Sequence, residues 1–170
     1  PRPEARAPAR VGAAPEAGWA SSAGPVSVVR PSRSTGGRAE GDGDAALAGK
    51  RVLIVDDDVR NVYALTSALE DRGMEAVYAP DGRAGIELLQ REKDIDLVLM
   101  DVMMPGMDGH ETTRAIRQLD GFQDLPIIAL TAKAMRGDRE QSLAAGASDY
   151  ITKPVDLDEL LEMMREWLYR

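Results

Sequence analysis

The chain has 170 residues, of which 44% are hydrophobic and 4% aromatic, and its formal net charge is −8. The length suits one domain with an appendage. The absence of cysteine excludes disulfides and thiolate metal sites, and the acidic balance argues against nucleic acid as a partner. No apolar run approaches the roughly 18–20 residues needed to cross a membrane. We therefore expect no direct membrane contact and a cytoplasmic location.

Residues 1–48 differ in composition from the rest of the chain. They are rich in Ala, Pro, Gly and Arg, contain six of the ten prolines, and show no sustained apolar pattern. Such a segment cannot bury enough apolar surface to offset the entropy lost on ordering. We predict a disordered linker over 1–48 and a folded domain over 49–170, with a partner-binding segment as the alternative for 1–48. The first residue is Pro1 rather than Met, which suggests a fragment of a longer protein.

From Gly49 onward, short apolar runs alternate with amphipathic stretches. The runs predict strands at 51–55, 74–79, 95–100, 126–130 and 148–151, and the stretches predict helices at 59–72, 82–92, 109–119, 133–145 and 157–168. Continuous apolar strands suit a parallel sheet buried on both faces. The sequence therefore predicts an α/β, doubly wound, five-stranded parallel sheet. The two usual strand orders are flavodoxin-like and Rossmann, but no GxGxxG motif follows the first strand.

Local signals place several helix ends and one helix face. Asp58, Asp108 and Asp156 are expected to cap the helices that follow them, and Glu111 and Glu159 stand where capping boxes would be completed. The apolar stripe of the first helix is expected to face the core; it comprises Val59, Val62, Leu65 and Leu69. The single histidine, His110, is expected to be a solvated surface residue.

Polar side chains follow four of the five predicted strands. Asp56 and Asp57 follow the first strand, Asp101 the third, Thr131 the fourth, and Lys153 stands just after the fifth. In open parallel sheets, sites lie beyond the carboxyl ends of the strands. Convergent carboxylates either raise a pKa or recruit a cation. Oxygen ligands without Cys or His indicate Mg²⁺, with Mn²⁺ or Ca²⁺ as alternatives.

Asp101 is the residue in this group best placed for covalent chemistry. It ends a buried apolar run, where an unpartnered carboxylate is costly to ionise. A carboxylate can attack phosphorus directly and form an aspartyl phosphate without a general base. An ammonium group from Lys153 and a hydroxyl from Thr131 can neutralise and orient phosphoryl oxygens. The residues therefore indicate phosphoryl transfer to Asp101.

Residues 51–168 resemble the receiver domain of two-component response regulators, in particular receivers joined to hybrid histidine kinases. The resemblance is carried, in chain order, by VLIVDDD at 52–58, LMDVMMPGMDG at 99–109, ALTA at 129–132 and DYITKP at 149–154. It implies the flavodoxin-like fold with strand order 2-1-3-4-5 and five helices.

The resemblance also implies roles for individual residues at the metal site. Asp101 would be the phosphoacceptor and would contribute to the metal site. Asp57 would be a direct ligand, Asp56 would act largely through water, and the Met103 backbone carbonyl would complete the protein's share of the Mg²⁺ shell.

Further roles concern the phosphoryl group and the response to it. Thr131 and Lys153 would bind the phosphoryl oxygens, with a cis bond between Lys153 and Pro154, and Tyr150 would be the aromatic switch. The donor would be a histidine kinase or a histidine phosphotransfer protein. The face formed by the fourth helix, fifth strand and fifth helix would then shift and could support a homodimer. We expect no output domain after Arg170, and therefore expect output through protein contacts or onward relay.

Two other functions are compatible with the same residues. The first is an Asp-nucleophile phosphohydrolase. Such enzymes place a second Asp two residues after the nucleophile, where this chain has Met103. The second is a docking module whose acids bind Mg²⁺ without phosphotransfer.

Overall fold

The computed structural model describes residues 45–132 and 136–169. Its sheet has five parallel strands in the order β2-β1-β3-β4-β5. The strands are β1 (Arg51–Val55), β2 (Glu75–Ala79), β3 (Leu97–Asp101), β4 (Ile127–Thr131) and β5 (Asp149–Thr152). The predicted flavodoxin-like strand order is confirmed, and it makes β1 and β3 neighbours at the centre of the sheet.

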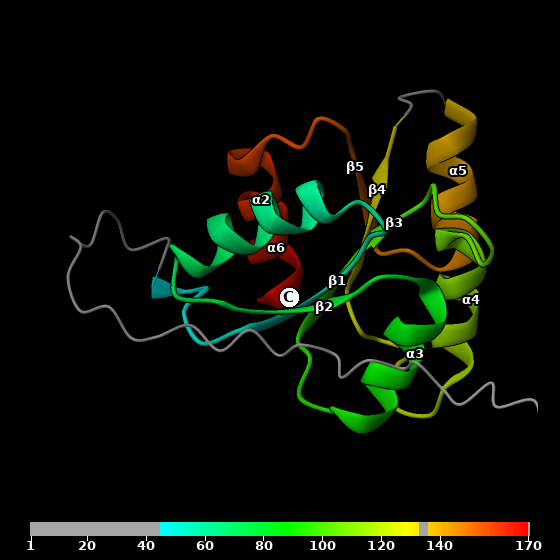
Figure 1. Cartoon of the computed structure of the whole chain (residues 1–170), viewed down its shortest axis with the longest axis horizontal. Coiled ribbons are helices and arrows are strands. Elements are labelled where there is room, and N and C mark those ends of the chain that lie inside the picture. Colours follow the sequence, from blue (N-terminus) through cyan, green and yellow to red (C-terminus); the bar gives the residue numbers. More distant parts are fainter. Residues whose placement is uncertain (1–44, 133–135, 170) are drawn as a thin grey trace, which may run out of the picture.

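Helices cover both faces of this sheet. They are α2 (Val59–Glu70), α3 (Gly82–Arg91), α4 (Gly109–Gln118), α5 (Arg136–Ala145) and α6 (Leu157–Leu168). Figure 1 shows α2 and α6 on one face and α3, α4 and α5 on the other. Within the described residues, no helix has the length and apolar character that a membrane crossing would need.

Strands β1 to β4 each supply apolar side chains to both layers of the core, whereas β5 supplies Ile151 to the layer under α2 and α6. On β1, Ile54 packs into the cluster under α2 and α6, whereas Leu53 and Val55 pack into the cluster under α3 and α4. All five residues of β3 and of β4 are buried. This two-sided burial explains why the strands are continuous apolar runs, because each buried aliphatic side chain contributes roughly 1.5–3 kcal/mol.

The observed element ends differ slightly from the predicted ones. Met74 and Ile95 are buried but precede β2 and β3, because apolar burial begins before ladder pairing does. Residues 133–135, predicted to start a helix, lie outside the described residues. Asp108 and Glu111 form the predicted capping box, and Asp156 accepts a hydrogen bond from the backbone N–H of Glu159.

Val59 does not join the core, so this part of the predicted stripe is wrong. Its side chain is 67% exposed, whereas Val62, Leu65 and Leu69 are buried. Val59 is the first residue of α2 and directly follows the capping residue Asp58. The core therefore begins to cover α2 only from Val62 onward.

The packed domain includes a residue that composition alone assigns to the N-terminal segment. Leu47 is fully buried in the cluster under α2 and α6. The backbone N–H of Gly49 donates to the carbonyl of Gly73 at 2.8 Å, which ties this stretch to the turn before β2. The predicted disorder of 1–48 falls mainly on residues 1–44, which lie outside the described residues.

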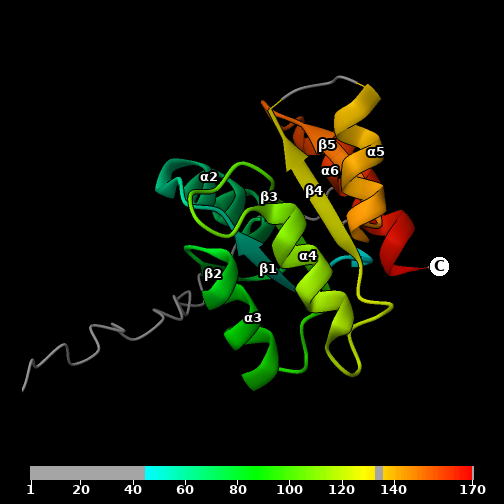
Figure 2. The ribbon, with the colours of Figure 1, turned by 90° about the vertical axis from the view of Figure 1, so that its right-hand side faces the viewer.

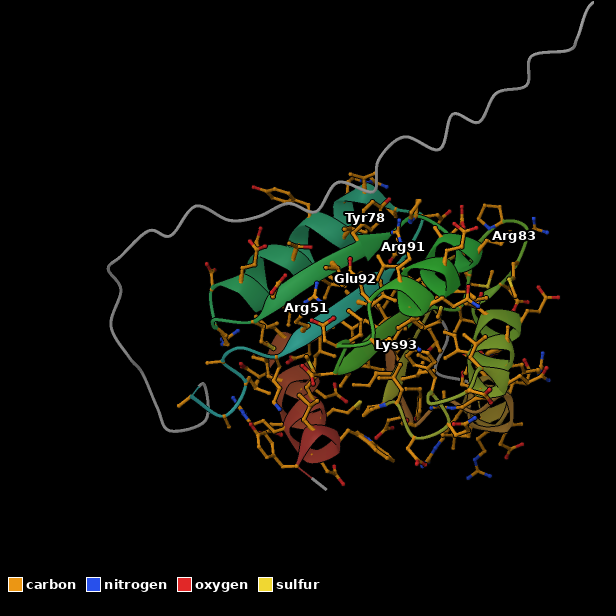
Figure 3. All side chains as sticks on the ribbon, turned by 90° about the horizontal axis from the view of Figure 1, so that it is seen from below. Arg51, Tyr78, Arg83, Arg91, Glu92 and Lys93 are labelled. Atoms are coloured by element: carbon orange, nitrogen blue, oxygen red, sulfur yellow. The ribbon has the colours of Figure 1, made fainter. Side chains whose placement is uncertain are left out.

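An arginine organises the amino-terminal edge of the sheet. The Arg51 guanidinium pairs with Glu92 at 2.7 Å and Glu75 at 3.3 Å, and it also pairs with Asp94. Figure 3 shows Arg51 on β1 close to Glu92 at the end of α3. These acids are thus held by a cation at the edge opposite the strand ends that carry Asp56 and Asp101.

Gly109 provides a sharp test of how α4 approaches β3. A Cβ atom at this position would lie 2.2 Å from the Asp101 carbonyl oxygen and 2.7 Å from the Val102 Cα. Because backbone atoms must move, we expect Gly109→Ala to lower the free energy of unfolding by about 2–4 kcal/mol in urea titrations.

Gly137 is the matched control for this substitution. It lies in α5, and a Cβ there would meet no atom within 4 Å. Gly137→Ala should therefore raise the free energy of unfolding by about 0.5–1 kcal/mol. Equal effects of the two substitutions would contradict the close approach of α4 to β3.

Candidate functional site

Three carboxylates converge at the carboxyl edge of the sheet. Asp56 and Asp57 follow β1, and Asp101 is the last residue of the neighbouring strand β3. One oxygen atom from each lies within 4.8 Å of the others. Asp56 and Asp101 are buried, whereas Asp57 is exposed. The predicted convergence of these three acids is confirmed.

Lys153 brings a positive charge into this cluster from the loop after β5. Its ammonium nitrogen lies 3.1 Å from Asp101 Oδ1 and 3.4 Å from Asp56 Oδ2. The Lys153 backbone N–H donates to the Thr131 carbonyl at 2.6 Å. The predicted cis bond between Lys153 and Pro154 is present. Thr131, the last residue of β4, is buried beside this loop.

Backbone N–H groups fix both buried carboxylates. Asp56 Oδ1 accepts a hydrogen bond from the N–H of Asp58 at 2.8 Å, and Asp101 Oδ1 accepts one from the N–H of Met103 at 3.2 Å. Each acid thus bonds to the residue two positions later, at the point where the chain leaves the strand. The Met103 residue itself is 68% exposed.

The electrostatics of the site are unfavourable to a fully ionised cluster. Burial raises the pKa of Asp101 to about 6, and the charge of Asp56 adds to this, although hydrogen bonds from Lys153 and Met103 oppose it. Burial acts to lower the pKa of Lys153, but its hydrogen bond to Asp101 and the two acidic charges outweigh burial and raise it. One ammonium group therefore does not neutralise the cluster.

The donor set fits a hard divalent cation. The three acids offer oxygen atoms only, and two of them are buried with a charge excess that a cation would remove. Mg²⁺ favours carboxylate oxygens together with retained waters and a shared phosphate. Asp56, Asp57 and Asp101 are therefore suited to hold Mg²⁺ at the open side of the site.

Tyr150 lies apart from the carboxylates, on the edge strand β5. It is half-buried, and the guanidinium carbon of Arg139 on α5 lies 5.5 Å from its ring centroid. This contact fits a cation–π interaction. The sequence carries no local signal for Arg139 as its partner, because the two residues approach each other only once α5 packs beside β5.

His110 is not the solvated surface residue that the sequence predicts. Its side chain is half-buried, and its Nε2 lies 3.0 Å from the buried Ser142 hydroxyl. His110 therefore connects α4 to α5 rather than facing solvent alone. A buried hydroxyl needs a hydrogen-bond partner, and His110 provides one.

A groove opens directly beside the acidic cluster. It has a volume of about 290 Å³ and is lined by apolar residues of α2 and of the loop before α6, with Asp56 and Lys153 among its lining residues. Two exposed apolar residues of α2, Val59 and Tyr63, lie on the same helix.

Comparison with known protein families identifies the fold and the site together. The profile of the response regulator receiver domain matches residues 52–165. The chain belongs to the response regulator receiver family. The cluster of Asp56, Asp57 and Asp101 is consistent with the phosphoacceptor site of such a receiver in a two-component phosphorelay.

Individual relatives extend this comparison. The chain is 43% identical over 120 residues to the sensor protein GacS of Pseudomonas syringae, covering 69% of this chain and 13% of GacS. It is 40% identical over 112 residues to PilH of Pseudomonas aeruginosa, covering 66% of this chain and 92% of PilH. The chain thus spans only a small part of the sensor kinase it resembles.

A solved structure supports the interpretation of the acidic cluster. The receiver domain of a sensor histidine kinase from Pseudomonas aeruginosa has a magnesium ion coordinated in its active-site cleft. The TM-score is 0.67 with 36% sequence identity, and the match covers 72% of this chain and 100% of that domain.

The raised pKa of Asp101 predicts a pH-dependent difference in stability. The unfolded chain ionises this acid near its ordinary pKa of 3.8, whereas the folded chain does so at about 6. Neutral Asp101 therefore stabilises the folded state below pH 4. This contribution to the free energy of unfolding is lost as the pH rises through 6. Without metal, the parent should lose about 2–3 kcal/mol relative to Asp101→Asn between pH 4 and 7.

Urea unfolding in EDTA at several pH values measures this difference. The stability of the variant relative to the parent should grow with pH. A constant or shrinking difference would show that Lys153 compensates the buried charge of Asp101 more fully than the geometry indicates.

Proposed function

We propose that this domain accepts a phosphoryl group on Asp101 from the phosphohistidine of a histidine kinase or a histidine phosphotransfer protein. The observation that carries the proposal is the position of Asp101 between Lys153, at 3.1 Å, and the two further acids of the cluster. The family and the similarity to sensor kinases support the same function.

Transfer begins at the carboxylate of Asp101. One of its oxygens attacks phosphorus, the new O–P bond forms, and the P–N bond of the donor breaks, with its electron pair leaving on the imidazole. Asp101 attacks in its ionised form, so no general base is required. The hydrogen bond from the Met103 N–H orients the carboxylate throughout.

Mg²⁺, with Mn²⁺ as an alternative, would neutralise carboxylate and phosphoryl oxygens at this site when bound. Asp57 and Asp101 would be direct ligands, Asp56 would act largely through water, and the Met103 carbonyl would complete the protein's share. Lys153 stands where it can pair with a phosphoryl oxygen, and Thr131 would bind another through its hydroxyl. Both groups compensate negative charge that the transfer brings into a buried site.

Output would follow from changes around Thr131 and Tyr150. The face expected from the sequence to shift corresponds to α5, β5 and α6, and it carries Tyr150 against Arg139. Movement of Thr131 toward a phosphoryl group would change the space in which the Tyr150 ring packs. This face would then alter its affinity for a partner or a second copy of the chain. A cytoplasmic location, where such kinases donate, belongs to the same proposal.

Exposed apolar side chains indicate where the donor would dock. Val59, Tyr63 and Met103 are 67%, 75% and 68% exposed. Val59 lies at the start of α2, close in sequence to Asp56, and Met103 follows Asp101. A helix from the donor could cover these side chains and present its phosphohistidine to Asp101.

The acceptor assignment is tested with acetyl phosphate as a small donor. The parent should gain a phosphoryl group in a Mg²⁺-dependent reaction followed by intact mass, and Asp101→Asn should gain none. Asp120→Asn, at an exposed position after α4, is the control and should match the parent. Equal uptake by Asp101→Asn would refute the assignment. Release of phosphate from phosphomonoesters at catalytic rates would instead indicate a phosphohydrolase.

The docking surface is tested by separating protein donors from small ones. Tyr63→Ala should slow phosphotransfer from a phosphohistidine-bearing donor protein by about tenfold, because an exposed aromatic anchor is lost. Uptake from acetyl phosphate should stay unchanged, since Tyr63 does not belong to the acidic cluster.

Leu143→Ala is the matched control for this comparison. Leu143 is an apolar residue, 40% exposed, on α5 rather than α2. Truncation of the Leu143 side chain should leave the rate of phosphotransfer from the protein donor and from acetyl phosphate unchanged. Equal slowing by Leu143→Ala and Tyr63→Ala would contradict docking at α2.

A further inference from the structure

Helix α6 joins the phosphoacceptor site to the point where the N-terminal segment enters the domain. Lys153, which pairs with Asp101 and Asp56, lies three residues before Asp156, the N-cap of α6. At the other end, Tyr169 directly follows α6 and caps it, with its N–H bonded to the Arg165 carbonyl. A helix of 12 residues spans roughly 18 Å.

The C-terminal end of α6 holds the first described residues of the chain. The Tyr169 hydroxyl donates to the carbonyl of Ala46. The ammonium nitrogen of Lys50 lies 5.6 Å from the centroid of the Tyr169 ring, on the same stretch of chain. Figure 2 shows this stretch, in cyan, beside the end of α6, in red. We define residues 45–50 as the junction.

The junction and α6 also share one part of the core. Leu47 is fully buried. It belongs to the cluster that contains Leu160, Leu161 and Met164 of α6. Val155, in the short loop between Lys153 and α6, packs against the same cluster. Close-packed cores transmit small displacements because they contain little free space. A shift of α6 would therefore displace Leu47.

We propose that α6 is a lever that reports the phosphorylation state of Asp101 to the junction. The inference rests on the proposed function, since it requires a phosphoryl group on Asp101. In the unphosphorylated protein Lys153 pairs with two carboxylates. A phosphoryl group offers Lys153 new oxygen partners, which displaces the loop before α6. The displacement passes along α6 to Tyr169 and loosens its hold on Ala46.

Two backbone hydrogen bonds in the junction allow the lever to be observed. The Gly49 N–H donates to the Gly73 carbonyl at 2.8 Å, and the Lys50 N–H donates to the Leu47 carbonyl at 3.2 Å. Loosening of the junction should raise hydrogen exchange at these amides. We expect about a threefold rise in the exchange rate of a peptide covering 45–50 when the full chain is phosphorylated by acetyl phosphate and Mg²⁺.

Three comparisons make this measurement decisive. Asp101→Asn, treated identically, should show no rise. Tyr169→Phe keeps the ring over which Lys50 lies but removes the hydroxyl that reaches Ala46. In this variant, phosphorylation should be normal by intact mass, but the rise at the junction should fall by more than half. Lys50→Met removes the charge above the ring and should weaken the response in the same direction.

The outcomes separate failure of the lever from failure of the proposed function. A phosphorylated parent, verified by mass, whose junction exchanges at the unphosphorylated rate would overturn the lever. A full rise retained in Tyr169→Phe would overturn transmission through the end of α6. A parent that takes up no phosphoryl group at all would refute the proposed function instead.

Discussion

The arrangement of this domain depends on one ammonium group placed between two buried carboxylates. Lys153 lies within 3.4 Å of Asp56 and 3.1 Å of Asp101, both almost inaccessible to solvent. Burying two like charges costs desolvation free energy, and the attraction of one cation offsets only part of it. The site therefore retains an attraction for further positive charge. A divalent cation and a phosphoryl group together would supply both the missing charge and a new partner for Lys153.

The fold brings these groups together because each stands at the end of a parallel strand. Strands β1 and β3 are hydrogen-bonded neighbours, so the residues that follow them emerge side by side. The loop after β5 reaches the same edge, where the Lys153 N–H bonds to the Thr131 carbonyl. Gly109 allows α4 to begin close against the Asp101 backbone. The acidic residues at the opposite edge are held by Arg51 and lie away from this chemistry.

Much of this architecture was predictable because it depends on patterns that are local in the chain. The apolar runs indicated a two-sided sheet, and the acids at their ends indicated where the site would form. Apolar periodicity could not show that Val59 is exposed, because it carries no information about which turn of the helix the core first covers. Side-chain contacts between residues far apart in the sequence could not be predicted from local patterns either. His110 meets Ser142 across 32 residues, and Tyr169 meets Ala46 across 123.

These distant pairings matter because a switch needs a contact that differs between its two states. A phosphoryl group can shift a conformational equilibrium only through interactions that one state makes better than the other. Under the proposed function Lys153 would be such a contact, since its present partners are two carboxylates and a phosphoryl group on Asp101 would change their surroundings. Tyr150 against Arg139 lies on one side of it along β5, and α6 leads away on the other. A single charged side chain would therefore bias two surfaces of the domain, because Tyr150 precedes it on β5 and α6 follows it in the chain.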